Sequence, residues 1–268
     1  MLLTADIGNT NITLGIFNNK DQYIDEFRLA SDRDLSQQEY ENLLKSLFKD
    51  YKIEGCIIAS VVEELSEKFC CAVKNVFKIS PIFVTNKINC GIKIVSDKPA
   101  EVGADRIANA SAVANGKYKG KSIIVIDFGT ATTFDIINSK GEFCGGVIAP
   151  GLNTQLKCLE KVTSKLPRIE ASISPYAVGH NTQEAILSGV IRGTACMVDG
   201  LVKQCEKELG ERAVLVATGG YCGLISNYLE RQFDEVNPIL TLEGLRQIYY
   251  LNCNNYSTQT ACMLSDLK

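Results

Sequence analysis

The chain opens on the stretch that decides its fold, Leu2-Leu3-Thr4-Ala5-Asp6-Ile7-Gly8-Asn9-Thr10-Asn11-Ile12-Thr13-Leu14-Gly15-Ile16-Phe17. An apolar run reaches Asp6, a polar turn interrupts it, and an alternation of apolar and polar residues resumes at Ile12. Two such runs joined by a short turn predict a β-hairpin. Gly8 lets a ligand approach the backbone, and the polar turn residues add side-chain donors. With a carboxylate at its mouth this hairpin suits a metal-bound polyphosphate, although taken alone it is more simply an ordinary surface hairpin.

A second copy of the pattern occurs nearly half a chain later, Ser122-Ile123-Ile124-Val125-Ile126-Asp127-Phe128-Gly129-Thr130-Ala131-Thr132-Thr133-Phe134-Asp135-Ile136-Ile137. In both copies an apolar strand ends in Asp, a hydrophobic residue and Gly, followed by small polar residues and a second apolar strand. Self-similarity at this spacing predicts a duplicated domain in which each half begins with the same hairpin. We expect the halves, 1–115 and 116–268, to pack together with a cleft between the two turns. Asp6 and Asp127 would then need a cation to lie near polyphosphate oxygens, unless they merely cap their turns.

The rest of the pattern predicts an α/β protein in which each half is a mixed sheet flanked by helices. Further strands are expected at 22–27, 55–62, 81–84, 145–149 and 213–217. Helices are expected at 35–48, 65–76, 101–114, 153–159, 182–205 and 241–253.

Composition is that of a soluble globular protein, with 46% hydrophobic and 22% charged residues among 268. A net charge of −3 gives no support to binding of nucleic acid or of an anionic membrane. We expect no apolar run to reach the ~18 residues of a membrane helix, and Asp6 interrupts the opening run, which speaks against a signal peptide. We therefore expect a cytoplasmic protein.

Eleven cysteines at irregular spacing could indicate a disulfide framework. The odd count and the expected location argue instead for reduced thiols. There is no Cys-x-x-Cys pair, and His180 is the only histidine, so the sequence does not predict a zinc cluster.

A third element, Val214-Leu215-Val216-Ala217-Thr218-Gly219-Gly220, is a buried strand that runs into paired glycines. Glycines at such a position let the chain pass close to an adenosine face or a phosphate. By itself Thr-Gly-Gly is more often a simple strand-to-helix turn. Beside two hairpins of the expected kind it favours nucleotide binding.

Together, the two hairpins and the Thr-Gly-Gly element resemble the superfamily of sugar kinases, heat-shock chaperone ATPases and actin. Within it, Glu101-Val102-Gly103-Ala104-Asp105-Arg106 and Asp6-Ile7-Gly8-Asn9-Thr10 are similar to type III pantothenate kinases, and the motif order matches over essentially the whole chain. The resemblance implies two ribonuclease H-like (actin-like ATPase) domains with the active site in the cleft between them. It also implies ATP-dependent phosphorylation of (R)-pantothenate to (R)-4′-phosphopantothenate, the first step of coenzyme A synthesis.

The same resemblance implies roles for the nucleotide-binding residues. ATP would be held by the hairpin residues Asp6 to Thr13, by Thr130, and by Gly219 and Gly220, with Mg²⁺ accompanying it. Asp127 would ligate a monovalent cation, potassium or ammonium. This fits the sequence, because neither hairpin tip carries a lysine or arginine.

For the acceptor substrate, the resemblance implies that Asp105 is the general base and that Gly103, Ala104, Asp105 and Arg106 contact pantothenate. From spacing alone, Asp105 and Arg106 would rather be a charged pair in the first turn of a helix. Thr182 precedes a predicted helix and would ordinarily be its cap. The resemblance implies that Thr182 also contacts pantothenate, across the interface of a homodimer built on the helix that begins there.

One departure leaves the acceptor open. Where this family often has a tyrosine before the Gly-Ala-Asp-Arg segment, the chain has Ser96. Three alternatives therefore stand beside a pantothenate kinase: a kinase for another small hydroxy compound, a non-catalytic regulator on the same scaffold, and an actin-like or chaperone-like ATPase. Intact Asp105 and both phosphate turns argue against the regulator. The chain leaves no room for the extra subdomains of the last class.

Overall fold

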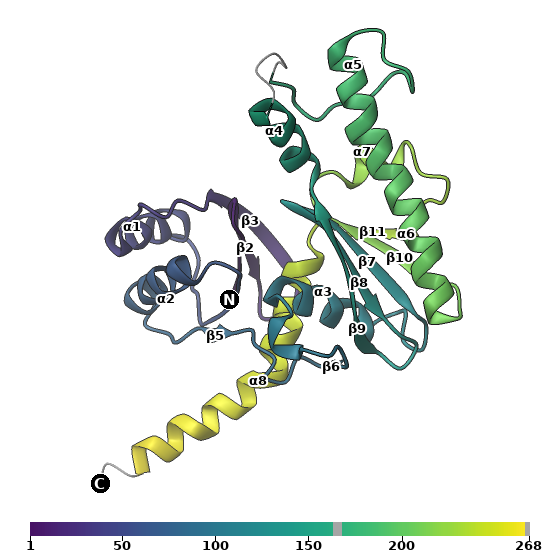
Figure 1. Cartoon of the computed structure of the whole chain (residues 1–268). Helices are drawn as coiled ribbons and strands as arrows, with labels where there is room; N and C mark the ends of the chain where they lie inside the picture. Colours follow the sequence, from purple (N-terminus) through teal and green to yellow (C-terminus); the bar gives the residue numbers. More distant parts are fainter. Residues whose placement is uncertain (163–167, 266–268) are drawn as a thin grey trace. The chain divides into compact units, whose positions relative to one another are not determined.

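The computed structural model describes residues 1–162 and 168–265, and their side chains other than those of 162 and 254–265. The chain divides into two compact units, shown in Figure 1. The first comprises Met1–Gly116 and the chain from Leu240 onward, and the second comprises Lys117–Ile239.

The first unit is built on a five-stranded mixed sheet of order β3-β2-β1-β4-β5. The hairpin β1–β2 is antiparallel, β3 continues it antiparallel, and β4 and β5 run parallel to β1. The strands are β1 (Leu2–Ile7), β2 (Asn11–Phe17), β3 (Tyr23–Ala30), β4 (Gly55–Ser60) and β5 (Ile82–Phe83). The other elements are α1 (Gln37–Leu47), α2 (Glu63–Phe77), β6 (Lys93–Ile94), η1 (Pro99–Glu101), α3 (Ala104–Ala114) and α8 (Leu240–Ser265).

Helices cover both faces of this sheet. On one face, side chains of β1, β2 and β4 form an apolar core with α1 and α2, centred on Tyr40, Leu44 and Phe69. On the other face α8 approaches the strands where they lack side chains: a Cβ atom at Gly15 would lie 2.8 Å from Leu242, and one at Gly55 would overlap the Tyr249 hydroxyl. Glycine in these strands therefore makes room for a helix.

The second unit repeats the arrangement, with its strands in the order β11-β10-β7-β8-β9. The hairpin β7–β8 is antiparallel, β9 pairs antiparallel with β8, and β10 and β11 continue parallel to β7. The strands are β7 (Ile123–Phe128), β8 (Ala131–Ile137), β9 (Glu142–Pro150), β10 (Val214–Thr218) and β11 (Glu235–Val236). The helices are α4 (Leu152–Val162), α5 (Thr182–Leu187), the π-turn η2 (Ser188–Arg192), α6 (Gly193–Leu209) and α7 (Cys222–Ser226).

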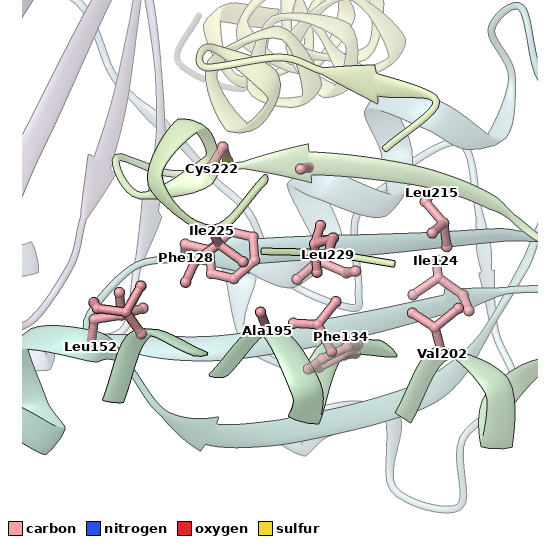
Figure 2. Close-up of a cluster of buried hydrophobic side chains, with 14 of the residues drawn as sticks. Ile124, Phe128, Phe134, Leu152, Ala195, Val202, Leu215, Cys222, Ile225 and Leu229 are labelled. Carbon is pink, nitrogen blue, oxygen red and sulfur yellow. The ribbon is translucent and has the colours of Figure 1, made fainter. Parts of the chain in front are cut away.

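The core of the second unit lies between its sheet and these helices. Figure 2 shows Ile124, Phe128 and Phe134 of the sheet facing Ala195 and Val202 of α6. By length and composition alone, residues 182–209 could cross a membrane, so the expectation that no such stretch exists is wrong. Half of its apolar window is buried inside the unit, as in a core helix of a soluble protein.

The predicted duplication is confirmed in detail. Strands β1 and β7 share one burial pattern, in which the aspartate is the only half-buried residue. The turns after β2 and β8 are also equivalent: Asn18 and Asn138 each accept backbone N–H bonds, at 2.8–3.0 Å, from the residues two and four positions later. The sequence carries this signal as Asn-x-Lys at both sites, a further repeat that the strand pattern alone did not reveal.

The division of the chain differs from the expected one at its C-terminal end. The boundary expected after residue 115 lies one residue from the observed division. Residues 240 onward do not belong to the second unit, because α8 packs on α3 and on the sheet of the first unit. Gly244 lets the two helices meet, since a Cβ atom there would overlap the carbonyl group of Ala108.

Candidate active site

The first hairpin closes with a tight turn at the end of β1. Its last ladder pair is Ile7 with Ile12, and the Gly8 amide donates to the Asn11 carbonyl at 3.0 Å. Asn9, Thr10 and Asn11 are exposed at the tip, while Asp6 is half-buried opposite Thr13. The turn is braced from behind by Ser31, whose hydroxyl donates to the Gly8 carbonyl at 2.5 Å. Backbone and side-chain donors are thus presented to solvent on a fixed frame.

The Gly-Ala-Asp-Arg segment lies close to this hairpin within the first unit. Because β1 and β4 run parallel, their carboxyl ends share an edge, and the Val61 amide donates to the Ile7 carbonyl at 3.1 Å. A Cβ atom at Gly103 would lie 3.7 Å from Val61 and only 2.5 Å from Oδ1 of Asp105. The fold therefore brings Asp105 to the edge where the first hairpin ends.

Asp105 stands in the first turn of α3, where Gly103 is the N-terminal cap. Its Oδ1 atom accepts the backbone N–H of Arg106 at 2.8 Å, which orients the carboxylate. Asp105 and Arg106 are half-buried, and Ala104 is buried beside them. The Asp105 carboxylate therefore presents oriented oxygen acceptors at the start of α3.

The second hairpin is one residue tighter than the first. Phe128 pairs with Thr132, and the Gly129 amide donates to the Ala131 carbonyl at 3.0 Å. The carbonyl of the exposed Thr130 accepts two bonds from the start of α4, from the Gly151 amide at 3.0 Å and from Thr154 Oγ1 at 2.7 Å. A Cβ atom at Gly151 would overlap the carbonyls of Gly129 and Thr130, so only glycine fits.

The Thr-Gly-Gly element lies directly beside this hairpin, because β10 is parallel to β7 and pairs Thr218 with Asp127. Gly219 has a φ of +90°, and a Cβ atom there would lie 2.7 Å from Oδ1 of Asp127 and from the Phe128 backbone. Glycine is required here both for its backbone conformation and for the close approach. Gly220 is exposed next to it.

A buried thiol completes this part of the site. Cys222 is 3% exposed, and its Sγ donates to the Thr218 carbonyl at 2.9 Å. Burial first, and then the Asp127 carboxylate, raise the pKa of Cys222 to about 12. The thiol is therefore a neutral neighbour of Asp127. Every cysteine whose side chain the structure describes is a free thiol.

Thr182 lies on a groove of about 750 Å³ between α4 and the helix formed by α5 and η2. It is not the helix cap that its position predicts. Asn181 caps α5 by accepting the Glu184 amide at 2.9 Å, and Thr182 is the first helical residue. The groove walls are mostly apolar, with Pro150, Thr154, Gln155, Cys158, Leu159, Ala185, Ile186, Gly189 and Val190 as the other lining residues.

Each unit thus gathers a subset of the predicted residues. The first holds the hairpin 6–13 beside Gly103–Arg106, and the second holds Asp127, Thr130, Gly219 and Gly220 together. Sequence reasoning missed Gly151, Thr154 and Cys222. The Pro-Gly pair at 150–151 was a turn signal that could have drawn attention to the first of them.

Solved structures share this fold. A conserved protein from Campylobacter jejuni assigned to the Baf family of transcriptional activators superposes with a TM-score of 0.60 at 23% identity, covering 94% of this chain and 99% of that one. The activator of 2-hydroxyisocaproyl-CoA dehydratase from Clostridium difficile, with bound ADPNP, gives 0.53 at 13% identity, covering 97% of both chains. The duplicated mixed sheets therefore give the protein the fold that these solved structures share.

Sequence comparison narrows this fold to one family. The model of the type III pantothenate kinases matches residues 2–204. A relative named type III pantothenate kinase, from Dehalococcoides mccartyi (strain CBDB1), is 44% identical over 256 residues, covering 94% of this chain and 96% of the relative. The chain belongs to the type III pantothenate kinase family, a family of phosphotransferases.

Proposed function

We propose that this protein transfers the γ-phosphoryl group of ATP to the primary hydroxyl of (R)-pantothenate, giving (R)-4′-phosphopantothenate and ADP for coenzyme A synthesis. The observation that carries the proposal is the placement of the Asp105 carboxylate at the start of α3, next to the end of the first hairpin. A kinase for an alcohol needs a carboxylate that can take the hydroxyl proton and a separate cradle for the phosphates.

The first unit would supply the base and part of the cradle. Asp105 would accept the proton of the pantothenate hydroxyl as the hydroxyl oxygen bonds to the γ-phosphorus of ATP. The bond between the γ-phosphorus and the bridging oxygen then breaks, and ADP leaves. The Arg106 amide keeps the carboxylate oriented through its 2.8 Å hydrogen bond. Gly103, Ala104 and Arg106 line the acceptor side, and the hairpin from Asp6 to Thr13 offers its exposed donors to the phosphates.

The second unit would offer its own groups to a nucleotide. Thr130 and the glycines 219 and 220 would present backbone to the nucleotide, and Gly219 approaches the Asp127 carboxylate so closely that a Cβ atom there would lie 2.7 Å from Oδ1. Because no lysine or arginine occurs at either hairpin tip, cations must offset the phosphate charge. Asp127 is an oxygen ligand suited to a monovalent cation such as potassium or ammonium, and bound Mg²⁺ would supply charge neutralisation at the phosphates.

We further propose that Thr182 contacts pantothenate and that the protein works as a cytoplasmic homodimer. The apolar groove beside Thr182 supports a protein contact on this side of the second unit. Light scattering at micromolar concentration measures the oligomeric state, and a monomer there would overturn the dimer alone.

The decisive experiment follows ADP release by a coupled assay, with pantothenate present or absent and with potassium or a bulky organic cation. We expect pantothenate-dependent turnover that needs potassium. Turnover without a monovalent cation would overturn the role of Asp127, whereas no pantothenate-dependent ADP release in potassium would overturn the substrate.

Ser96 keeps one other function open, phosphorylation of a different small hydroxy compound. Its Oγ is buried and has no hydrogen-bond partner among the described residues, so this hydroxyl is left for an acceptor that reaches it. A panel of small alcohols in the same assay distinguishes the two, because the true acceptor has the highest kcat/KM.

A further inference from the structure

We propose that Arg192 and Tyr228 form a clamp that positions the strap, residues 174–181, and through it the Thr182 side of the groove. Both would be positioning residues for pantothenate, which neither need touch. The inference rests on the proposed function for its kinetic consequence, but the clamp itself can be measured without any substrate.

The π-turn η2 explains why Arg192 is available for this task. The Gly193 amide donates to the Ser188 carbonyl five residues back, so one residue more than in an α-helix is accommodated here. An inserted residue rotates the subsequent helical turns by about 100°. Before the π-turn, Thr182 and Ala185 face the groove, and Gly189 lines it from within the π-turn, whereas after the π-turn Ala195 and Val198 face the core.

Arg192 donates hydrogen bonds to the first two residues of the strap. Its Nη2 donates to the Ser174 carbonyl at 2.9 Å and to the Pro175 carbonyl at 3.4 Å, and its Nε donates to Ser174 Oγ at 3.3 Å. The guanidinium also stacks over the Tyr228 ring, with Cζ 4.7 Å from the ring centroid. A planar, forked cation makes these contacts together in a way that a lysine cannot.

Tyr228 holds the same residue from the other side. Its hydroxyl accepts the Ser174 amide at 2.8 Å and donates to the Ser174 carbonyl at 3.1 Å. Ser174 is 1% exposed, whereas Tyr176 and Val178 further along are 50% and 78% exposed. The strap therefore buries little of its own side-chain surface, and its position depends on the hydrogen bonds made at Ser174.

The far end of the strap is tied to the helix that carries Thr182. Ser188 Oγ donates to the Ala177 carbonyl at 2.6 Å, and a Cβ atom at Gly179 would overlap the Ala185 amide. Asn181 then caps α5 immediately before Thr182. A shift of the strap at Ser174 would consequently move the cap and the first turn of α5, where the substrate contact is proposed.

The test compares Arg192→Met, Arg192→Lys and Tyr228→Phe with wild type, and uses Arg212→Met, an exposed arginine beyond the end of α6, as the matched control. Hydrogen exchange of the Ser174 amide, which Tyr228 accepts, and of the amides of 176–178 measures the clamp with no substrate present. We expect exchange about tenfold faster in Arg192→Met, and a KM for pantothenate about tenfold higher, equivalent to about 1.4 kcal/mol. The KM for ATP and kcat should stay within about twofold of wild type, because a positioning contact is lost and not the chemistry. The exchange rate and the KM for pantothenate of Arg192→Lys should lie between those of wild type and Arg192→Met. Both quantities should be unchanged in the Arg212→Met control.

Unchanged exchange in both Arg192→Met and Tyr228→Phe would overturn the clamp, and should the first variant fail to fold, the conservative second one decides. Faster exchange with an unchanged KM for pantothenate would overturn the positioning role. An equal rise of the KM for both substrates would point to general loss of structure and overturn it as well. Absence of pantothenate turnover in wild type would refute the proposed function, and exchange would still decide the clamp.

Discussion

Asp105 illustrates how a neighbouring residue without a side chain can shape a reactive group. A Cβ atom at position 103 would lie 2.5 Å from Oδ1 of Asp105, so glycine leaves the carboxylate the space it occupies. The Arg106 amide then fixes its orientation. The sequence pattern could only say that a carboxylate stands in a first helical turn; the reason for Gly103 is visible only when the side chain is in place.

We predict that Asp105→Asn lowers kcat by about 10²- to 10⁴-fold, the usual contribution of a general base. Asparagine keeps the size of the side chain but cannot accept the proton. Binding of ATP, followed by titration calorimetry, should be nearly unchanged, and Asp50→Asn on the exposed surface serves as control. A variant with wild-type kcat would rule out the base.

Cys222 should be chemically silent at ordinary pH. Since burial and the Asp127 carboxylate raise its pKa to about 12, the reactive thiolate forms only as the pH rises toward that value. In iodoacetamide labelling read by mass spectrometry, we expect the rate at Cys222 to increase up to about pH 11. A small free thiol in the same solution, with the ordinary pKa of about 8.5, should level off at a lower pH. A plateau for Cys222 below about pH 10 would contradict the assignment.

At the scale of elements, α4 links the second phosphate turn to the groove. Thr154 lines the groove and donates from Oγ1 to the Thr130 carbonyl, which also accepts the Gly151 amide. Nothing in the local sequence pattern shows this contact, because it joins a turn to a helix that begins more than twenty residues later.

We predict that Thr154→Val raises the KM for ATP about fivefold, the effect of losing a hydrogen bond worth about 1 kcal/mol. Valine keeps the shape and removes only the donor. Thr154→Ser restores the donor and should behave as wild type in the same steady-state kinetics. If valine and serine act alike, the hydrogen bond does not support the nucleotide.

The elements themselves were largely predictable, and the exceptions have physical causes. The expected helix over 182–205 is confirmed as a run of helical turns, but the π-turn at Ser188–Arg192 was not expected from the sequence pattern. Thr182 was a reasonable cap by propensity. Asn181 takes that role because its backbone is extended and its oxygen reaches the Glu184 amide.

At the scale of the whole molecule, the C-terminal helix is the feature that sequence order misplaces. It comes after the second unit along the chain, yet it packs on α3 and on the first sheet through positions where side chains are missing. Loss of the close packing of α8 on α3 and the sheet should therefore destabilise the first unit, although α8 is far from the rest of that unit in sequence.

We predict that Gly244→Ala lowers the free energy of unfolding by about 3 kcal/mol, because the new Cβ overlaps the Ala108 carbonyl and the helices must separate. Gly200→Ala is the matched control: it lies inside α6 with open space around it, and should stabilise by about 0.5–1 kcal/mol. Urea denaturation followed by circular dichroism measures both. Equal midpoints for the two variants would contradict the packing argument.

The sequence by itself determined the duplicated α/β fold, the paired hairpins and the family, because strand periodicity, turn residues and the repeated Asp-hydrophobic-Gly pattern are local signals that survive without the third dimension. Only the tertiary structure decided where α8 belongs, why Gly103, Gly151 and Gly219 must be glycine, and how Arg192 reaches the strap. Those features depend on atoms that are distant in sequence and meet only when sheets and helices pack, so no window along the chain contains them.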